Sequence, residues 1–577
     1  MMGPAMVHTS SEPRPSPPSF PEARAVAPAA GPGPREDDPG AALPWLGKLG
    51  RPPVALFLVT GLGGLLRFWQ LGTKGMWLDE AFSVWMARHP LAEMLGWIAR
   101  IDQHPPLYYL LLHLWLALGD DPATVRALSA LFSTLTVPVV YALGHRLAGP
   151  RTGLVAALLL ALAPFHVRFA QEARMYALLT FGAALAMLAL AHLLTDPRAA
   201  QVPLGSQLAR FVRTWRAASP GSIRPSLQAI HTDLAWLGYI LATAAVLWTQ
   251  HTGIFLPLAA NGWVLGLWAW RRCRPTFSSD LILPSPRNWL WAQAAILLLW
   301  SPWIPVLLYQ AWGVYREFWI PAPTPAAVWR TLQTFFSAHF PLTGAWSSPL
   351  WIGYLLLLGL GGLRLRRQPA RLALLLALWL TPFVGELAVS LRRPIFYDRT
   401  LLWASMPVYL LLALGVVHLR PRSWMLAVLA LLIGVNGLSL HRYYRHFQKE
   451  QWREAAAYVA QRVRDEDLLL FHGTWVQIPF DYYFRAYDRP VARHGVPVDL
   501  FERGVLEPKM TRADLPRLRE RIRGFERVWL IYSHDWYTDP EGLIPRTLDQ
   551  ELELVERRGF YGLEVRLYRR PPRSPAP

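Results

Sequence analysis

The chain has 577 residues, of which 53% are hydrophobic and 28 are tryptophan, and its formal net charge is +19. So apolar a composition excludes a set of ordinary soluble domains, and the apolar residues come in blocks of about 20, enough for a helix to cross a bilayer. The excess charge is mostly arginine between these blocks, which indicates membrane orientation and argues against nucleic-acid binding. The single cysteine, Cys273, excludes an intramolecular disulfide and a multi-cysteine metal site.

The first 50 residues are rich in proline, alanine and glycine and contain few large apolar side chains. Such a segment buries too little apolar surface to offset the entropy lost on ordering, so we expect a disordered tail over 1–50. The chain does not open with a positive stretch followed by a short apolar core, so the sequence does not predict a cleaved signal peptide.

Apolar blocks from residue 53 onward predict an α-helical polytopic membrane protein with about eleven transmembrane helices within residues 51–440. The predicted spans are 53–71, 124–145, 152–169, 175–195, 233–250, 253–270, 289–311, 349–363, 371–391, 400–418 and 423–440. The block PPLYYLLLHLWLALG (105–119) is shorter than a comfortable span. We therefore predict that residues 75–122 form helices on the outer membrane surface.

The charge of the loops decides the orientation. If 105–119 does not cross, one side carries the arginine-rich loops 145–151, 196–232, 271–274, 364–371 and 418–422. The positive-inside rule makes that side cytoplasmic, which predicts a cytoplasmic N-terminus in the plasma membrane. The polar residues that then fall on the outer side, and could converge on one cavity, are Asp79, Glu80, His104, Arg126, Glu172, Arg174, His251, the 312–348 loop, Arg392, Arg393 and Arg399.

After His441 the pattern becomes that of a soluble domain. QWREAAAYVAQRVR predicts an amphipathic helix, DLLLF and RVWLIYS predict buried strands, and GLEVRLYRR predicts an alternating terminal strand. We expect a small α/β domain over residues 441–577. An odd number of spans places it outside the cytoplasm.

Two adjacent carboxylates, Asp79 and Glu80, follow the first predicted span in MWLDEAFSVW. An acidic pair at the start of a surface helix is ordinarily favoured by the helix dipole alone. In an apolar setting beside a membrane, however, a carboxylate is costly without a partner or a function. It could take a proton from a hydroxyl nucleophile or, together with His104, hold a divalent metal.

Other candidate residues begin predicted helices on the outer side. His104 stands before two prolines in HPPLYY, where it could also be incidental to a helix start. Arg126 could snorkel to lipid head groups, as lone arginines near helix ends usually do. The turn QEARMY, with Glu172, Arg174 and Tyr176, is more polar than a simple re-entry into the membrane requires.

A second basic group precedes the span at 400–418. Arg392, Arg393 and Arg399 lie on the predicted outer side, against the positive-inside trend, which favours a site for phosphate oxygens. Recognition of lipid head groups is the alternative. The sequence lacks GxxxxGK[ST], HExxH, GxSxG and CxxC, so it gives no motif support for ATP-driven transport, zinc-protease or esterase chemistry.

The acidic pair followed by HPPLYYLLLHLW, DPATVRALSALFS and PFHVRFAQEARMYAL resembles the polyprenyl-phosphate-sugar-dependent glycosyltransferases of the GT-C superfamily. The nearest likeness is to the protein O-mannosyltransferase and aminoarabinose transferase group, glycosyltransferase family 39-like. The resemblance covers about residues 50–440, and the first 200 are the most specific. It implies a membrane enzyme that moves a sugar from a polyprenyl-phosphate donor to a glycan, lipid or protein acceptor outside the cytoplasm.

The resemblance also implies roles for single residues. Asp79 corresponds to the catalytic base and Glu80 to the second acidic position, while Arg126 corresponds to an arginine associated with the donor phosphate. The late Arg-Tyr motif reads Arg399-Thr400 here, which departs from the family pattern. The predicted phosphate-binding set is Arg126, Arg174 and Arg399, supported by His104, Glu172, Tyr176 and His251.

The expected reaction is an inverting transfer in which Asp79 activates the acceptor hydroxyl and an arginine stabilises the departing phosphate. It requires no cofactor, although Asp79, Glu80 and His104 could hold a divalent metal. Two alternatives stay open: a flippase for lipid-linked glycans, and a membrane anchor for a working C-terminal domain. The sequence names neither the sugar nor the acceptor.

Overall fold

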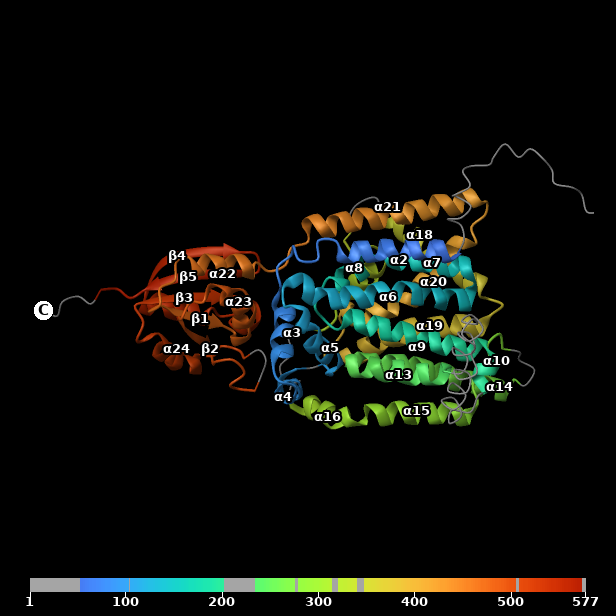
Figure 1. The fold of residues 1–577 in the computed structure, drawn as a ribbon, viewed down its shortest axis with the longest axis horizontal. Coiled ribbons are helices and arrows are strands. Elements are labelled where there is room, and N and C mark those ends of the chain that lie inside the picture. The colour runs from blue at the N-terminus through green and yellow to red at the C-terminus, as the bar shows by residue number, and fades with distance from the viewer. Residues whose placement is uncertain are drawn as a thin grey trace, which may run out of the picture. The chain divides into compact units, whose positions relative to one another are not determined.

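The computed structural model describes residues 52–102, 104–201, 234–274, 279–313, 320–339, 347–504 and 508–572. The predicted tail 1–50, most of the 196–232 loop and parts of the 312–348 loop lie outside these ranges. The described chain is a bundle of apolar helices followed by a small sheet domain (Figure 1). The predicted fold class, a helical polytopic membrane protein with a C-terminal α/β domain, is confirmed.

The apolar helices follow the predicted spans. Within the described residues, seven segments are long and apolar enough to cross a membrane, and the pair α7 and α8 adds an eighth if it counts as one bent span. The three remaining predicted spans coincide with shorter apolar helices. The bounds are α2 (Pro52–Phe68), α6 (Pro122–Ala148), α7 (Pro150–Leu162), α8 (Pro164–Ala170), α9 (Tyr176–Thr195), α10 (Pro197–Gln201), α13 (Ala235–Thr249), η3 (His251–Ile254), α14 (Phe255–Cys273), α15 (Pro286–Trp300), η4 (Ser301–Trp303), α16 (Ile304–Gly313), α17 (Pro325–Ser337), α18 (Ser347–Arg364), α19 (Pro369–Ser390), η6 (Asp398–Ala404), α20 (Ser405–Val417) and α21 (Arg422–His446).

The bend between α7 and α8 has an identifiable cause. Pro164 is the first residue of α8, and the two helices meet at 57°. Proline has no N–H to continue the helical ladder, so α7 ends at Leu162. The bend turns the chain toward the segment 171–174, which carries candidate site residues.

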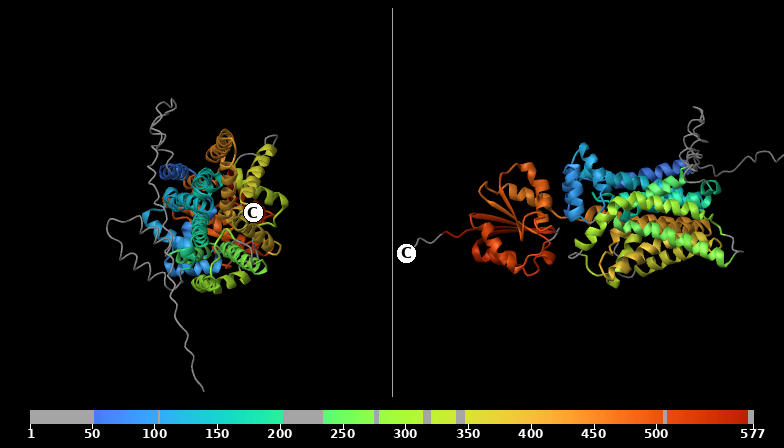
Figure 2. Two further views of the ribbon diagram at one scale, coloured as in Figure 1. Left: turned by 90° about the vertical axis from the view of Figure 1, so that its right-hand side faces the viewer. Right: turned by 90° about the horizontal axis from the view of Figure 1, so that it is seen from below.

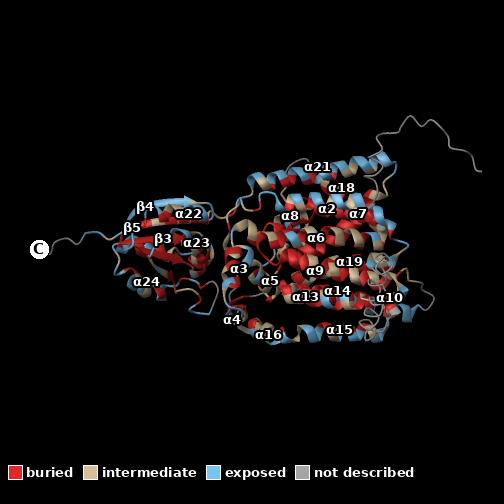
Figure 3. Ribbon diagram, in the orientation of Figure 1, coloured by how far each residue is buried: buried red, intermediate tan, exposed pale blue. Residues whose placement is uncertain are grey.

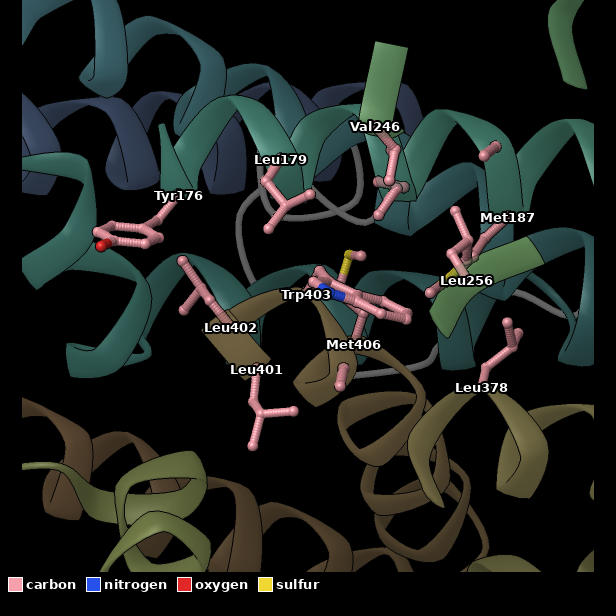
Figure 4. Close-up of a cluster of buried hydrophobic side chains, with 14 of the residues drawn as sticks. Tyr176, Leu179, Met187, Val246, Leu256, Leu378, Leu401, Leu402, Trp403 and Met406 are labelled. Carbon is pink, nitrogen blue, oxygen red and sulfur yellow. The ribbon is translucent and has the colours of Figure 1, made fainter. Parts of the chain in front are cut away.

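Burial ranks the helices from the centre of the bundle outward. In the segment Asp398–Val417, 94% of the apolar 18-residue stretch is buried inside the protein. The corresponding share is 28% in α21 and 17% in Pro286–Ala311 (Figure 3). The peripheral helices expose leucine and tryptophan, such as Leu298 and Trp291 of α15, as lipid-facing surfaces require. Around Trp403 of η6, apolar side chains from α9, α13, α14 and α19 meet in the central core (Figure 4).

Three short helices lie at one end of the bundle, where Figures 1 and 2 both place them beside the sheet domain. They are α3 (Leu78–Arg88), α4 (Leu91–Ile101) and α5 (Leu107–Trp115), the last extended by η1 (Leu116–Leu118). They occupy the region 75–122, for which the sequence predicts surface helices. The apolar run Leu107–Leu118 is a short helix, below the length of a span.

The C-terminal domain is a five-stranded sheet with the order β2-β1-β3-β5-β4. Strands β2, β1 and β3 are parallel, and β5 and β4 are antiparallel to their neighbours. Alternate residues of the central strands enter two apolar clusters, one on each face. The bounds are α22 (Trp452–Ala460), β1 (Leu468–His472), η7 (Thr474–Val476), α23 (Gln477–Phe484), η8 (Arg485–Tyr487), β2 (Ala492–Val496), η9 (Arg512–Asp514), α24 (Leu515–Ile522), β3 (Arg527–Tyr532), α25 (Asp535–Thr538), α26 (Leu543–Glu551), β4 (Glu553–Phe560) and β5 (Leu563–Arg569).

Candidate active site

Asp79 and Glu80 both lie in the first turn of α3, yet they point into different surroundings. Successive residues of an α-helix are rotated by about 100° around its axis, so neighbouring side chains do not share a face. The Asp79 side chain keeps 26% of its exposure, whereas that of Glu80 keeps none. Only Asp79 is therefore accessible to a substrate.

Glu80 is enclosed by donors. Its Oε1 accepts from Arg126 Nε at 2.7 Å and from the Ala173 amide at 2.9 Å. Its Oε2 accepts from Arg126 Nη2 at 2.7 Å and Lys449 Nζ at 2.8 Å. Burial alone would raise the pKa of Glu80, but the charges of Arg126 and Lys449 outweigh it and hold the pKa at about 2. Glu80 is thus an ionised structural anchor.

Arg126 uses its whole guanidinium inside the protein. Besides its two bonds to Glu80, Nη1 donates to the carbonyls of Leu71 at 2.9 Å and Lys74 at 2.8 Å, and Nη2 donates to Gly75 at 2.7 Å. A guanidinium has five N–H donors, so all of them are engaged. Arg126 fixes the segment that leads into α3. The prediction that it binds the donor phosphate would require one of these bonds to break, and it stays a prediction.

Asp79 faces two other arginines. Arg399 Nη1 lies 2.8 Å from Asp79 Oδ2, and Arg174 Nη1 donates to the Asp79 carbonyl at 3.3 Å. Burial alone would raise the pKa of Asp79, but the charges of Arg174 and Arg399 leave it below its usual value. Asp79 is therefore a carboxylate at neutral pH, able to accept a proton.

Arg174 differs from Arg126 because one of its N–H donors has no acceptor among the described residues. It is 4% exposed, and its buried Nε has no hydrogen-bond acceptor in the described part of the chain. Its Nη1 reaches Ser83 Oγ at 3.3 Å and Tyr109 Oη at the long distance of 3.5 Å. Arg399 lies over the rings of Tyr176 and Tyr397, with centroid distances of 5.5 and 4.7 Å. Two cations beside one reachable carboxylate form a suitable place for a phosphate.

His104 forms a pair that the sequence analysis missed. Its Nδ1 lies 2.9 Å from Oδ1 of Asp102, which is 3% exposed. Burial lowers the pKa of His104 more than Asp102 raises it, so the imidazole is neutral at neutral pH. The His104 ring lies within electrostatic range of the Asp79 carboxylate. An aspartate two residues before a histidine was the available signal.

The other predicted residues occupy varied positions. Glu172 Oε1 accepts from Arg168 at 3.4 Å, and its buried Oε2 has no partner among the described residues. His251 begins η3, within electrostatic range of Asp102 and His104. Arg392 and Arg393 are exposed, and Arg393 Nη1 donates to the Ala311 carbonyl at 3.0 Å.

Within the described ranges, no three His, Cys, Asp or Glu residues are grouped so that they could hold a metal ion. The predicted candidates Asp79, Glu80 and His104 belong to separate networks, since Glu80 is taken by Arg126 and Lys449. A divalent metal stays a prediction.

The C-terminal domain holds the start of α3 in place. Tyr483 Oη of α23 accepts from the Met76 amide at 2.7 Å. Glu450 Oε2, in the linker before the domain, accepts from the Leu78 amide at 3.3 Å and from Trp452 Nε1 at 2.6 Å. Burial lowers the pKa of Lys449 to about 8, so its ammonium still binds Glu80 at neutral pH. Both neighbours of Asp79 are therefore bound by linker residues.

Comparisons with known proteins agree with this architecture. Residues 103–206 match the family described as dolichyl-phosphate-mannose-protein mannosyltransferase. The structure is similar to ArnT from Cupriavidus metallidurans in the apo state, with a TM-score of 0.55 and 15% identity over 89% of this chain and 97% of that one. ArnT bound to undecaprenyl phosphate gives a TM-score of 0.54 at 14% identity, over the same shares. The chain has the GT-C glycosyltransferase fold.

A third similar structure is the oligosaccharyltransferase of Archaeoglobus fulgidus, with a TM-score of 0.49 and 10% identity over 89% of this chain and 74% of that one. No curated protein sequence matches the chain. The matched family and the ArnT structures belong to the GT-C glycosyltransferase superfamily, so the predicted resemblance is confirmed. The family match begins after Asp79 and Glu80, so the roles predicted for these two residues stay predictions.

Proposed function

We propose that this protein transfers a sugar from a polyprenyl-phosphate carrier to an acceptor hydroxyl on the outer side of the membrane, with Asp79 as the base. The observation that carries the proposal is the reachable Asp79 carboxylate between two arginines, Arg399 at 2.8 Å and Arg174 with an unused buried Nε. A structure of the same fold, that of ArnT, is bound to undecaprenyl phosphate.

The proposed reaction is a single displacement. The acceptor oxygen loses its proton to Asp79 and attacks the anomeric carbon from the face opposite the phosphate, so the configuration inverts. The bond from the anomeric carbon to the phosphate oxygen breaks, and the carrier leaves as a phosphate monoester with one more negative charge. Arg174 and Arg399 stabilise that charge more in the transition state than in the ground state. A phosphate leaves without a general acid, and the scheme uses no metal.

Donor binding would also strengthen the base. In the free protein the charges of Arg174 and Arg399 lower the pKa of Asp79, which makes it a weak proton acceptor. A donor phosphate bound by the same arginines neutralises part of their charge, so the pKa of Asp79 rises. A carboxylate with a higher pKa takes the hydroxyl proton more readily.

The outer-side assignment rests on the arginine-rich ends of the helices. Arg271 and Arg272 end α14, and Arg364 ends α18. Figure 1 places α10 and α14 at the end of the bundle away from α3 and the sheet domain. The positive-inside rule puts that end in the cytoplasm and Asp79 outside.

Replacing Asp79 by asparagine tests the base. Asp79→Asn keeps the shape of the side chain but cannot accept the proton, so we expect transfer to fall by about 100-fold or more. Donor affinity should be unchanged or higher, because Arg399 loses its carboxylate partner. Both are measured with purified protein, undecaprenyl-phosphate sugars and membrane extract, by mass spectrometry of the product and by donor titration.

The matched control is Asp121→Asn, since Asp121 caps α6 through the Ala123 and Thr124 amides and asparagine is an equally good cap. It should transfer at the rate of the unchanged protein. An active Asp79→Asn protein would contradict the assignment of the base. Movement of the lipid donor across the membrane without a new glycosidic bond would instead identify a flippase.

A further inference from the structure

A group of buried polar atoms without partners lies where α13 meets α14. The atoms are Gln250 Oε1, both ring nitrogens of His251, Thr252 Oγ1 and Gln310 Oε1, and none has a hydrogen-bond partner in the described chain. Gln250 is 6% exposed and Gln310 is fully buried. Leaving such a group unsatisfied costs about 1–3 kcal/mol. Several together indicate a place that a polar ligand or water fills.

The backbone of Gln250, His251 and Thr252 is held in one position by the elements around it. Gln250 ends α13 with extended backbone, and the 3-10 turn η3 follows directly. Gly253 packs against α13 so closely that an added Cβ would lie 2.6 Å from Val246 Cγ1 and 3.0 Å from the Val246 carbonyl oxygen. The turn is therefore held rigidly, and the three polar residues before Gly253 are held with it.

Gln310 comes from α16 and is oriented by its own amide. Its Nε2 donates to the carbonyls of Ile98 at 3.0 Å and Asp102 at 2.8 Å, so the end of α4 fixes the side chain. Its Oε1 then acts on His251 without forming a hydrogen bond of normal geometry. Residues of η3 and α16 therefore lie close to each other here.

The cluster borders the candidate active site through His104. Gln310 donates to the Asp102 carbonyl at 2.8 Å, and the Asp102 carboxylate lies 2.9 Å from His104 Nδ1. His104 in turn lies within electrostatic range of Asp79 and His251. A ligand whose anomeric carbon lies at Asp79 can therefore extend its ring toward His251. The proposed donor phosphate lies on the arginine side of Asp79, so the sugar ring is the part of the donor that remains to be held.

We propose that Gln250, His251, Thr252 and Gln310 form the binding site for the sugar ring of the donor, and that this sugar is neutral. The proposal rests on the proposed function and names its substrate class. Amide oxygens, an imidazole and a hydroxyl supply both donors and acceptors, which matches the vicinal hydroxyl groups of a hexose or pentose. A sugar carboxylate would need a cation and a sugar ammonium a carboxylate.

The charges near the cluster do not offer either partner. The charged or titratable groups that act on His251 in the described residues are Asp102 and His104. Asp102 already binds His104 at 2.9 Å, and Arg174 and Tyr109 also act on it. In the described residues, the carboxylate that acts on His251 is thus already engaged, and no lysine or arginine acts on His251, so a uronic acid or an amino sugar finds no dedicated partner there.

The test compares carriers with and without sugars on the purified full-length protein. The probes are undecaprenyl phosphate alone and the same carrier linked to mannose, arabinose, galacturonic acid or 4-amino-4-deoxyarabinose. We expect the mannose or arabinose donor to bind at least about 10-fold more tightly than the two charged donors, because a charged group would be buried here without a partner.

Two variants locate the site. His251→Leu and Thr252→Val should each weaken binding of the preferred neutral donor by about 10-fold, the effect of a lost buried hydrogen bond. Their affinity for undecaprenyl phosphate alone should stay within about 2-fold, which also shows that they are folded. His418→Leu is the matched control, since His418 bonds only its own helix at Leu414 in the described structure. It should change neither affinity.

Three results would overturn the inference while the proposed function stands. They are preference for a charged donor, equal affinity for all donors and the bare carrier, or unchanged donor binding in both variants, which would assign the cluster to buried water. A protein that binds neither the carrier nor any donor, and transfers none of the sugars, contradicts the proposed function itself.

Discussion

At the scale of single residues, two neighbouring acids divide the work of the site. Glu80 is sealed between Arg126 and Lys449 and anchors the structure, while Asp79 stays partly exposed beside Arg399. Breaking a buried ion pair on one side leaves an uncompensated charge and costs about 3–5 kcal/mol. A change at Glu80 should therefore impair folding, and a change at Asp79 should impair chemistry.

The state of Asp79 predicts a specific pH dependence. Its pKa in the free protein is held below the ordinary value by Arg174 and Arg399, against the effect of burial. Because the base must be ionised, kcat/KM should fall only as the pH drops below the ordinary pKa of an aspartate. In the donor complex the phosphate offsets those arginines, so the acid limb of kcat should lie at higher pH than that of kcat/KM.

The two limbs can be measured as initial rates of transfer at saturating and low donor concentration, from pH values below the ordinary pKa of an aspartate up to about pH 8. Asp121→Asn should show the same separation as the unchanged protein. Coincident limbs, or a kcat limb at lower pH, would mean that the donor does not share the arginines with Asp79.

The sequence predicts part of this site because its signals are local. Asp79 and Arg174 stand in short polar segments flanked by apolar spans. Lys449 was missed because its partner Glu80 is 369 positions away in the chain. The saturation of Arg126 depends on three carbonyls that only the folded loop brings together, so no residue pattern could separate it from Arg174.

At the scale of elements, hydrogen bonds from the linker that follows α21 fix the position of the start of α3. Lys449 Nζ binds Glu80 and the Gln171 carbonyl, and the next residue, Glu450, accepts from the Leu78 amide. The position of Asp79 between these two anchored residues is thus set by a segment outside the bundle. We expect the precision of catalysis to depend on this linker.

Replacing Lys449 by methionine should loosen α3 without removing a group that touches substrate. Methionine keeps the length and apolar body of the side chain but leaves Glu80 with Arg126 as its one cation, besides the Ala173 amide. We expect kcat to fall by about 10-fold while donor affinity changes little, because a small misplacement of the base is costly. Hydrogen exchange at residues 76–80 should become faster.

Arg445→Met serves as the control, since Arg445 is an exposed cation on the last turn of α21. It should leave both the rate and the exchange unchanged. Equal effects of the two substitutions would assign the loss to general destabilisation of the linker.

Elements were predictable where a single physical pattern dominates. Apolar length identified the spans, and runs such as LLLF and VWLIY identified β1 and β3. Strands β2 (ARHGV) and β4 (ELVERRGF) were missed because charged residues and glycine interrupt their few apolar residues, and β4 is almost entirely exposed. Both lie at the edges of the sheet, where pairing with one neighbour, and not burial, makes the strand.

At the scale of the whole molecule, direct contacts join the membrane bundle and the C-terminal domain. Phe501 of the domain is 6% exposed and packs on Trp85 of α3 and Trp97 of α4, with ring centroids 5.1 and 5.5 Å apart. Such aromatic contacts stabilise a junction beyond their buried area. The domain therefore packs directly on α3, the helix that carries Asp79.

The orientation can be tested with the single cysteine. Cys273 is exposed and ends α14 beside Arg271 and Arg272, so we expect it on the cytoplasmic side. A membrane-impermeant thiol reagent should leave Cys273 unlabelled in right-side-out vesicles and label it after permeabilisation. In a Cys273→Ser background, Arg558→Cys on the exposed strand β4 should be labelled in sealed vesicles. The reverse pattern would place Asp79 in the cytoplasm and contradict the proposed side of transfer.

The order of the two acids matters, because glutamate and aspartate differ in side-chain length. Glu80 spans the distance to Arg126 and Lys449 with one methylene more than aspartate has, and Asp79 meets Arg399 from a shorter stem. In a chain that reads Glu-Asp, the second acid would fall short of its two cations and the first would crowd the place of the acceptor hydroxyl. Among distant homologues, the dipeptide written in this direction is thus a sharper criterion for a working site than the count of acids in the loop.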